Sequence, residues 1–302
     1  MTASPLRVGL HTSIAGGLPK AVESAAAKGC DGFQIFARNP RGWMARELEC
    51  DEVRAFREAR ERANLWPLAI HSVYLINLAS QDPVGLERSR RAFREEIERG
   101  LRLGADYLVV HPGNPVSAPA EVGILTAVES IREATRDLNL RGASMDASGV
   151  GQPKGLTILI ENTAGQGSSI GCHFDHLADM LAMLDGLPVG VCLDTAHTLA
   201  AGYDIATAKG LKATVRLIER SIGFERIRLI HCNDSKAPCG ARVDRHQHIG
   251  EGHIGAEGFR RLTHTLKFRR IPFILETPVD GERDDVWNLN RLRELANESS
   301  DD

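Results

Sequence analysis

Short apolar runs recur eight times along the chain, and longer stretches with helical periodicity separate them. The eight runs cover residues 7–11, 32–36, 67–71, 107–111, 157–161, 189–194, 228–231 and 272–276. This alternation predicts repeated βα units. Because the runs are almost continuously apolar, we expect strands that are buried on both faces, as in a parallel sheet.

Eight βα units in 302 residues predict an α/β protein built as a single (β/α)8 TIM barrel. An open, doubly wound sheet is the alternative. Helical periodicity is clearest at 16–28, 51–63, 83–103 and 121–138. No Pro/Ser-rich linker divides the chain, so we expect one domain over 1–302, with a turn-rich surface-loop insertion at 141–155 and a frayed acidic tail at 297–302.

The composition is that of a globular protein and excludes a membrane span and a disulfide framework. Hydrophobic residues make up 42% of the chain, no apolar stretch approaches 18 residues, and the six cysteines form no CxxC pair. The first ten residues lack the apolar core of a signal peptide. We therefore expect a cytoplasmic protein with reduced cysteines. A formal net charge of −3 argues against non-specific coating of nucleic acid but permits a local basic groove.

Seven of the eight apolar runs end in a residue that can bind a metal ion. These residues are His11, His71, His111, Glu161, Asp194, His231 and Glu276. In a barrel the carboxyl ends of the strands surround the active site, so the seven side chains would converge on one cavity. A single histidine at a strand end is more often a hydrogen-bonded cap. Seven such residues together favour a metal site.

Two local spacings add further candidate ligands. His197 follows Asp194 by three residues, a separation that can span neighbouring ions across a loop. Asp244 and His246 are two residues apart, which places both side chains on one side of an extended backbone. The alternative for this second pair is a polar surface loop in which Asp244 pairs with Arg245.

The candidate ligands number nine and predict a multinuclear site. They are His71, His111, Glu161, Asp194, His197, His231, Asp244, His246 and Glu276. Nitrogen and oxygen donors without thiolate suit Zn²⁺, Mn²⁺ or Fe²⁺ better than Mg²⁺ or Ca²⁺. At three or four protein ligands per ion, with one bridging carboxylate, nine residues would serve about three ions. We leave His11 outside this set and expect it to orient a ligand or to contact the substrate.

The segment Gly250–Gly255 satisfies the GxGxxG pattern, but it is not expected to bind a nucleotide cofactor. A dinucleotide-binding turn requires a hydrophobic strand directly before its first glycine, whereas residues 244–248 here are polar. A glycine-rich turn between the seventh strand and a helix is instead a place where barrels bind phosphate through backbone N–H groups. We therefore expect a phosphate site at this turn.

Long motifs in the chain closely resemble those of the endonuclease IV family of metal-dependent apurinic/apyrimidinic (AP) endonucleases. They are GLHTSIAGG (9–17), HSVYLINLA (71–79), HPG (111–113), ENTAGQGSSIG (161–171), GVCLDTAHTLAAGYD (190–204), HCNDSK (231–236), DRHQHIGEGHIG (244–255) and LETP (275–278). The resemblance implies a trinuclear zinc site on the nine residues above. His71 and His111 would hold one ion; Asp194, His231 and Glu276 a second, with Glu161 bridging these two; and His197, Asp244 and His246 the third.

The resemblance also implies residues that bend DNA and insert through its minor groove. Arg41, Tyr74 and Leu75 match these inserting positions. Arg38 and Trp43 lie in the same loop as Arg41 and are expected to contact the DNA backbone. The alternative is that Tyr74, Leu75 and Ile76 are buried in a helix after the third strand.

These observations predict a DNA repair phosphodiesterase that cleaves 5′ to an abasic site in double-stranded DNA and also trims blocked 3′ ends. Glu161 and Glu276 are its expected catalytic residues, and about three Zn²⁺ per chain, replaceable by Mn²⁺, are its expected cofactors. We expect a nucleoid-associated monomer without a nucleotide cofactor. One alternative is a sugar isomerase or epimerase on a related barrel, with a single ion. A non-catalytic DNA-damage binding protein is another.

Overall fold

Eight parallel strands are arranged in the order of a closed barrel, β1-β10-β7-β6-β5-β4-β3-β2. The computed structural model describes residues 6–142, 155–281 and 283–298. The barrel strands are β1 (Val8–His11), β2 (Gly32–Phe36), β3 (Leu68–His71), β4 (Tyr107–Val110), β5 (Thr157–Glu161), β6 (Val189–Asp194), β7 (Ile227–His231) and β10 (Phe273–Leu275). A short antiparallel pair, β8 (Asp234–Ser235) and β9 (His246–Gln247), follows β7. The predicted TIM barrel is confirmed.

Helices alternate with the strands, as expected for βα units. They are α1 (Leu18–Ala27), α2 (Cys50–Ala63), α3 (Pro83–Leu103), α4 (Ala120–Thr135), α5 (Phe174–Met183), α6 (Thr195–Ala200), α7 (Ala208–Ser221), α8 (Gly255–His264), α9 (Leu266–Arg269) and α10 (Asp285–Asn297), with a 3-10 turn at Phe224–Arg226. The ends of α3 follow from its sequence. Asp82 caps the first turn by accepting from the Gly85 N–H, Pro83 occupies the first turn, and Gly104 ends the helix in a left-handed conformation.

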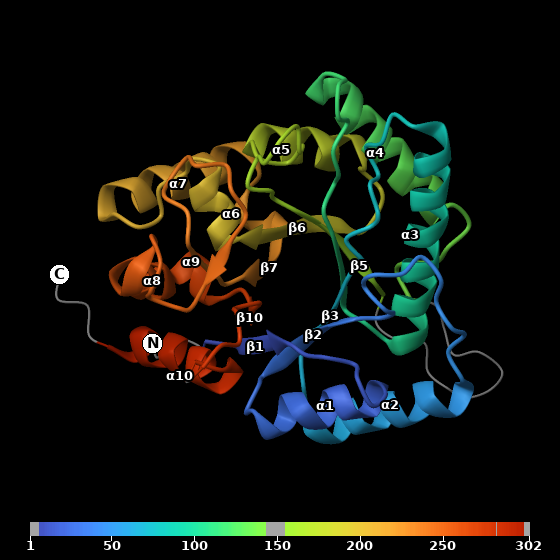
Figure 1. The fold of residues 1–302 in the computed structure, drawn as a ribbon, viewed down its shortest axis with the longest axis horizontal. Coiled ribbons are helices and arrows are strands. Elements are labelled where there is room, and N and C mark those ends of the chain that lie inside the picture. Colours follow the sequence, from blue (N-terminus) through green and yellow to red (C-terminus); the bar gives the residue numbers. More distant parts are fainter. Residues whose placement is uncertain (1–5, 143–154, 282, 299–302) are drawn as a thin grey trace. The chain divides into compact units, whose positions relative to one another are not determined.

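The described chain divides into two compact units. The first unit comprises the residues up to 11, 161–178 and those from 191 onward, and the second comprises 12–160 and 179–190. In the first unit β1 pairs with β10, β10 with β7, and β7 with β6. In the second unit β2 pairs with β3, β3 with β4, and β4 with β5. The helix α1 lies along α2 and α3 lies along α4 in this second unit (Figure 1).

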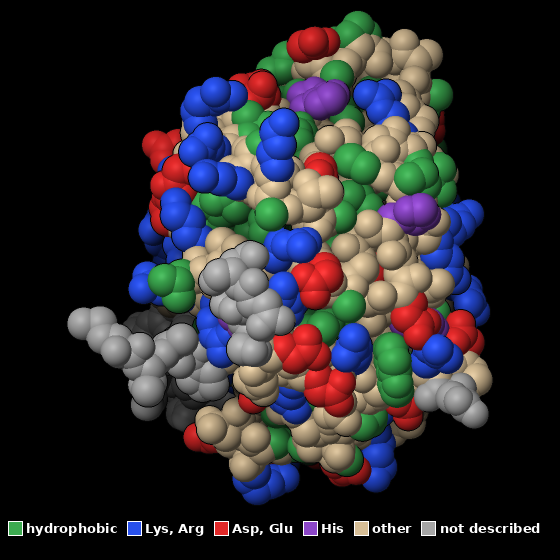
Figure 2. All heavy atoms as spheres, turned by 90° about the vertical axis from the view of Figure 1, so that its left-hand side faces the viewer, with side chains coloured by type: hydrophobic (Ala, Val, Ile, Leu, Met, Phe, Trp, Pro, Cys, Tyr) green, Lys and Arg blue, Asp and Glu red, His purple; other side chains and the backbone are tan. Residues whose placement is uncertain are grey.

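The predicted strands are buried as their apolar composition requires. All four residues of β3 and all six of β6 are buried. All six cysteines are free thiols, as expected. Among the described residues, none of the helices combines the length and apolar character needed to cross a membrane. Basic and acidic side chains are intermixed on the face in Figure 2, in keeping with a formal net charge of −3.

Two predicted segments fall wholly or partly outside this description. Residues 143–154 of the predicted surface loop and residues 299–302 of the predicted tail are outside the described residues. Asn297, where the tail was expected to begin, is the last residue of α10.

Candidate metal centre and DNA-contacting residues

The first unit gathers four metal-binding side chains at the carboxyl ends of its strands. Ligand atoms of Glu161, Asp194, His231 and Glu276 all lie within 4.8 Å of one another. The Nδ1 atom of His231 is 3.0 Å from Oε1 of Glu161 and 3.3 Å from Oε2 of Glu276. The β6–β7 register aligns Asp194 with His231. Glu161, Asp194 and His231 are completely buried, so three strands converge on a polar group that is closed to solvent.

A second group forms around the first turn of α6. Atoms of Asp194, His197 and His246 lie within 4.8 Å of one another. The segment from Asp194 to His197 was expected to be a loop, but it begins a helix, because the Asp194 carboxylate accepts from the His197 N–H at 2.7 Å and caps the first turn. Asp244 joins this group, with Oδ2 at 3.2 Å from Nε2 of His197 and Oδ1 at 3.5 Å from Nε2 of His246.

The rings of His197 and His246 are oriented as histidine ligands are in metal sites. Nδ1 of His197 lies 2.9 Å from the carbonyl oxygen of Asn162, and Nδ1 of His246 lies 3.1 Å from that of Glu276. A backbone carbonyl at Nδ1 fixes the ring and directs Nε2 toward a metal ion. Nε2 of His246 is buried and has no hydrogen-bond partner within the described residues. A buried imidazole nitrogen facing carboxylates fits a cation.

The electrostatics of the two groups of side chains also favour a bound cation. Burial lowers the pKa of His197, but Asp194, Asp244 and Glu161 together raise it by more, so that the pKa lies well above its usual value. Burial likewise lowers the pKa of His231, but Cys192, Glu276 and Glu161 together raise it by more, so that this pKa also lies well above its usual value. The carboxylates therefore create a buried negative field that favours any positive charge placed among them.

Two asparagines that the sequence analysis did not identify support the ligands. Asn233 donates to Oδ2 of Asp194 at 2.7 Å, and its own Oδ1 accepts from the Glu276 N–H at 2.8 Å. Asn162 accepts from the Asp194 N–H at 2.6 Å. The sequence could have indicated these two asparagines, because each lies one or two residues after a candidate ligand and residues just beyond a strand end share its surroundings.

His11 also contacts a candidate ligand. Its Nδ1 lies 3.1 Å from Oε1 of Glu276. This contact places His11 beside a candidate ligand, and its role in orienting that ligand or contacting the substrate stays a prediction.

The second unit contains the two remaining candidate ligands. The His71 and His111 rings have centroids 5.4 Å apart, His71 ending β3 and His111 following β4. Nδ1 of His71 lies 2.7 Å from the Ser72 carbonyl oxygen, the arrangement already seen for His197 and His246. The two imidazoles can therefore serve as a pair.

Tyr74 and Leu75 lie in turns after β3, not in a helix. Tyr74 is 69% exposed and Leu75 is 36% exposed. The Tyr74 ring packs edge-on against Phe36 at 5.3 Å between centroids and lies 5.8 Å from the His71 ring, so its inner side is supported. The alternative of a buried helix is wrong at these two positions, and both side chains are accessible to a ligand.

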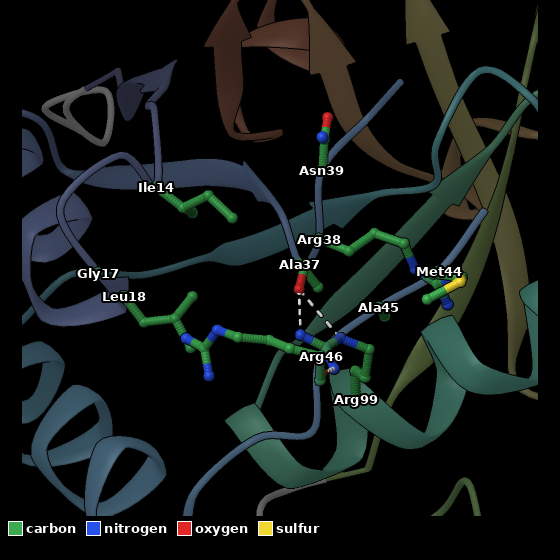
Figure 3. Close-up of a pocket in the computed structure, with 10 residues that line it drawn as sticks. All are labelled: Ile14, Gly17, Leu18, Ala37, Arg38, Asn39, Met44, Ala45, Arg46 and Arg99. Carbon is green, nitrogen blue, oxygen red and sulfur yellow. Dashed lines mark hydrogen bonds between the residues drawn. The ribbon is translucent and has the colours of Figure 1, made fainter. Parts of the chain in front are cut away.

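The loop after β2 separates two arginines that the sequence placed together. Arg41 is exposed. Arg38 is 3% exposed and pairs with the buried Glu96 at 2.9 Å, so the expected contact between Arg38 and DNA is wrong. Arg99 donates to the Ala37 carbonyl at 2.9 Å and thereby ties the start of this loop to α3 (Figure 3).

A cavity of about 310 Å³ lies beside this loop (Figure 3). Its lining includes Arg38, Arg46 and Arg99. Arg99 donates to the carbonyls of Ala37 and Arg46, and Arg38 pairs with Glu96. These guanidinium groups therefore hold the loop in place.

Trp43, in the same loop, is covered by the Arg88 guanidinium, whose central carbon lies 4.3 Å from the ring centroid.

The glycine-rich turn does not bind phosphate as expected. The carboxylate of Asp234 occupies the turn and accepts hydrogen bonds from the N–H groups of Gly250, Gly252 and Gly255. The predicted phosphate site is therefore wrong, because an internal anion already satisfies these donors.

A parallel (β/α)8 barrel with buried His, Asp and Glu side chains at its strand ends defines a metal-dependent barrel enzyme. The family model for the xylose isomerase-like TIM barrel matches residues 22–295. A protein of Solibacter usitatus (strain Ellin6076) described as "Probable endonuclease 4" is 46% identical over 294 residues, which cover 96% of this chain and 97% of that protein. The chain belongs to the endonuclease IV family and is a hydrolase.

Solved structures agree with this assignment. Endonuclease IV from Thermus thermophilus is similar with a TM-score of 0.81 and 38% identity, covering 96% of this chain and 98% of that one. A D-tagatose 3-epimerase-like protein has a TM-score of 0.61 at 19% identity, covering 95% of this chain and 94% of that one. The second likeness concerns the fold alone, so the isomerase alternative gains no support from it.

Proposed function

We propose that this chain is an AP endonuclease that cleaves the phosphodiester bond 5′ to an abasic site in double-stranded DNA, leaving a 3′-hydroxyl and a 5′-deoxyribose phosphate. The observation that carries the proposal is the cluster of buried Glu161, Asp194 and His231 with half-buried Glu276, in a chain of the endonuclease IV family. The same chemistry would trim blocked 3′ ends.

The nine candidate residues would hold about three zinc ions, with Mn²⁺ as a substitute. His71 and His111 would hold one ion, Asp194, His231 and Glu276 the second, with Glu161 shared between these two, and His197, Asp244 and His246 the third. Bound zinc would supply a nucleophile at neutral pH and neutralise charge on the phosphate. The buried carboxylates, the carbonyl-oriented rings of His197 and His246, and the buried Nε2 of His246 support this assignment.

Within this site the protein's own groups orient the reacting parts. Glu161 and Glu276 are the proposed catalytic residues, and His11 fixes the Glu276 carboxylate at 3.1 Å. Asp244 is the most accessible of the carboxylates, with 45% of its side chain exposed, so it marks the side from which a phosphate can approach.

Recognition of the lesion would use exposed side chains of the second unit. Arg41, Tyr74 and Leu75 would enter the minor groove and take the place of the unstacked abasic nucleotide. Tyr74 and Leu75 are an aromatic and an apolar side chain, and their exposure to solvent supports this role. The protein would act as a nucleoid-associated monomer in the cytoplasm.

The test is incision of a duplex with one abasic site, with an intact duplex as control and with the chemistry of both new ends determined. We expect a 3′-hydroxyl and a 5′-deoxyribose phosphate at the abasic site only. Binding without incision, or ends produced by β-elimination, would contradict the proposal.

A further inference from the structure

Asp234 is a completely buried carboxylate that lies three residues after His231 and outside both groups of candidate ligands in the first unit. Five backbone N–H groups donate to it. Oδ1 accepts from Ser235 at 2.8 Å and Ile254 at 2.9 Å, and Oδ2 accepts from Gly250 at 3.1 Å, Gly252 at 2.9 Å and Gly255 at 3.1 Å. A carboxylate surrounded by so many N–H groups is in the position of a bound anion.

The glycines make this close approach possible. A Cβ atom on Gly252 would lie 2.5 Å from Oδ1 of Asp234 and 2.4 Å from the Ser235 carbonyl oxygen. Gly250 and Gly255 have φ values of +84° and +71°, which side chains rarely allow. The turn is therefore shaped around the Asp234 carboxylate.

The same carboxylate caps α8. Ile254, which precedes the helix, provides no side-chain cap. The N–H groups of Ile254 and Gly255 donate instead to Asp234, and a negative charge at a helix N-terminus is favourable. The charge on Asp234 thus fixes where the loop ends and the helix begins.

The loop closed in this way carries two candidate ligands. Residues 236–255 leave β8 and return to α8, and Asp244 and His246 lie within them. The β8–β9 register pairs Ser235 with His246, and the His253 N–H donates to the Ser235 carbonyl at 2.8 Å. Asp234 holds the returning end of this loop, so it controls where the two ligands sit.

We propose that Asp234 is a positioning residue that holds loop 236–255 so that Asp244 and His246 face His197 and bind the third zinc ion. The inference rests on the proposed function, because that function assigns these three residues to a metal ion. Asp234 would act through the loop backbone and would touch neither zinc nor DNA.

The test compares Asp234→Asn with wild type in a chelator competition that resolves the affinity of each zinc ion. The amide keeps the size of the side chain, but its NH₂ group must face at least two of the five N–H donors. We expect the third zinc to bind about tenfold or more weakly, the scale seen when a partner beyond the ligands is lost, while the other two ions are retained. Glu251→Gln is the matched control, because it removes one negative charge from the same turn at an exposed side chain that pairs with Arg283.

Hydrogen exchange of the metal-free proteins gives a second readout that does not depend on activity. We expect faster exchange at residues 250–255 in Asp234→Asn and unchanged exchange in Glu251→Gln. Gly252→Ala disturbs the same turn while keeping the carboxylate, so it should reproduce the selective loss of the third zinc even where Asp234→Asn folds poorly.

The inference is overturned when both turn variants bind the third zinc as wild type does, or when both lose all zinc together. If the proposed trinuclear zinc site itself is wrong, the result is different, because the wild-type protein would then bind fewer than three zinc ions.

Discussion

Nδ1 of His231 lies 3.0 Å from Oε1 of Glu161, although 70 residues separate them in the sequence. The two residues end β7 and β5, and both are completely buried. A buried carboxylate is costly unless it is paired or binds a metal ion. This contact places Glu161 at the centre of the proposed site.

Replacing Glu161 with glutamine keeps its shape and removes its charge. We expect Glu161→Gln to bind an abasic duplex as wild type does. Its single-turnover cleavage should fall by at least about a hundredfold, because losing a ligand should cost no less than losing a residue that only orients a ligand, which costs up to about a hundredfold. Glu219→Gln, at an exposed residue that pairs with Lys267, is the control. Cleavage within a few-fold of wild type would refute a central role for Glu161.

Loss of His197 should affect one metal ion selectively. His197→Ala should reduce bound zinc from about three to about two per chain and remove most of the activity, because each ion needs three or four protein ligands. The barrel strands are unaffected, so the variant should fold, but the melting temperature of the metal-free protein should fall because His197 pairs with the buried carboxylates of Asp194 and Glu161. Elemental analysis and calorimetry measure the two quantities, and an unchanged zinc content would show that His197 is not a ligand.

The exposed side chains of the second unit should affect recognition and not metal content. Arg41→Ala and Tyr74→Ala should retain normal zinc while discrimination between abasic and intact duplex falls by about tenfold or more, since unstacking a base step costs a few kcal/mol that inserted side chains offset. Leu125→Ala, at an exposed apolar side chain of α4, is the matched control. Full discrimination together with lower thermal stability would mean that the two residues are structural.

The buried Glu96 should make stability depend on pH. Burial raises its pKa from 4.5 to about 7, against the opposing effect of Arg38. Between these pH values the folded protein keeps a proton that the unfolded chain has released, so the free energy of unfolding should fall by about 3 kcal/mol as the pH rises.

Glu96→Gln cannot ionise and supplies the comparison. Denaturant unfolding of both metal-free proteins at pH 5 and pH 8 should show the stability of wild type relative to the variant decreasing with pH. A difference that is the same at both pH values would contradict the raised pKa.

The sequence alone predicted the strands well because their continuous apolar runs are buried on both faces. Each strand end lies within one residue of its predicted position, and α3 spans the predicted residues. Polar groups at strand ends could be identified because a barrel brings these ends together. Five of these groups belong to the first unit; Glu161, Asp194, His231 and Glu276 converge there, and the fifth, His11, contacts Glu276.

Other features depended on partners distant in the chain. Arg38 is buried because Glu96 of α3 pairs with it, and the glycine turn is filled because Asp234 reaches it from β8. Neither pairing leaves a local pattern. The helix after Asp194 was missed because its cap is a side chain that also appeared to be a ligand.

Zinc titration into metal-free protein, with single-turnover incision of an abasic duplex measured at each step, tests the central claim most directly. The account predicts that incision remains close to background until about the third equivalent and then rises to its full rate. Full activity at one equivalent, or incision by metal-free protein, would contradict a trinuclear zinc site.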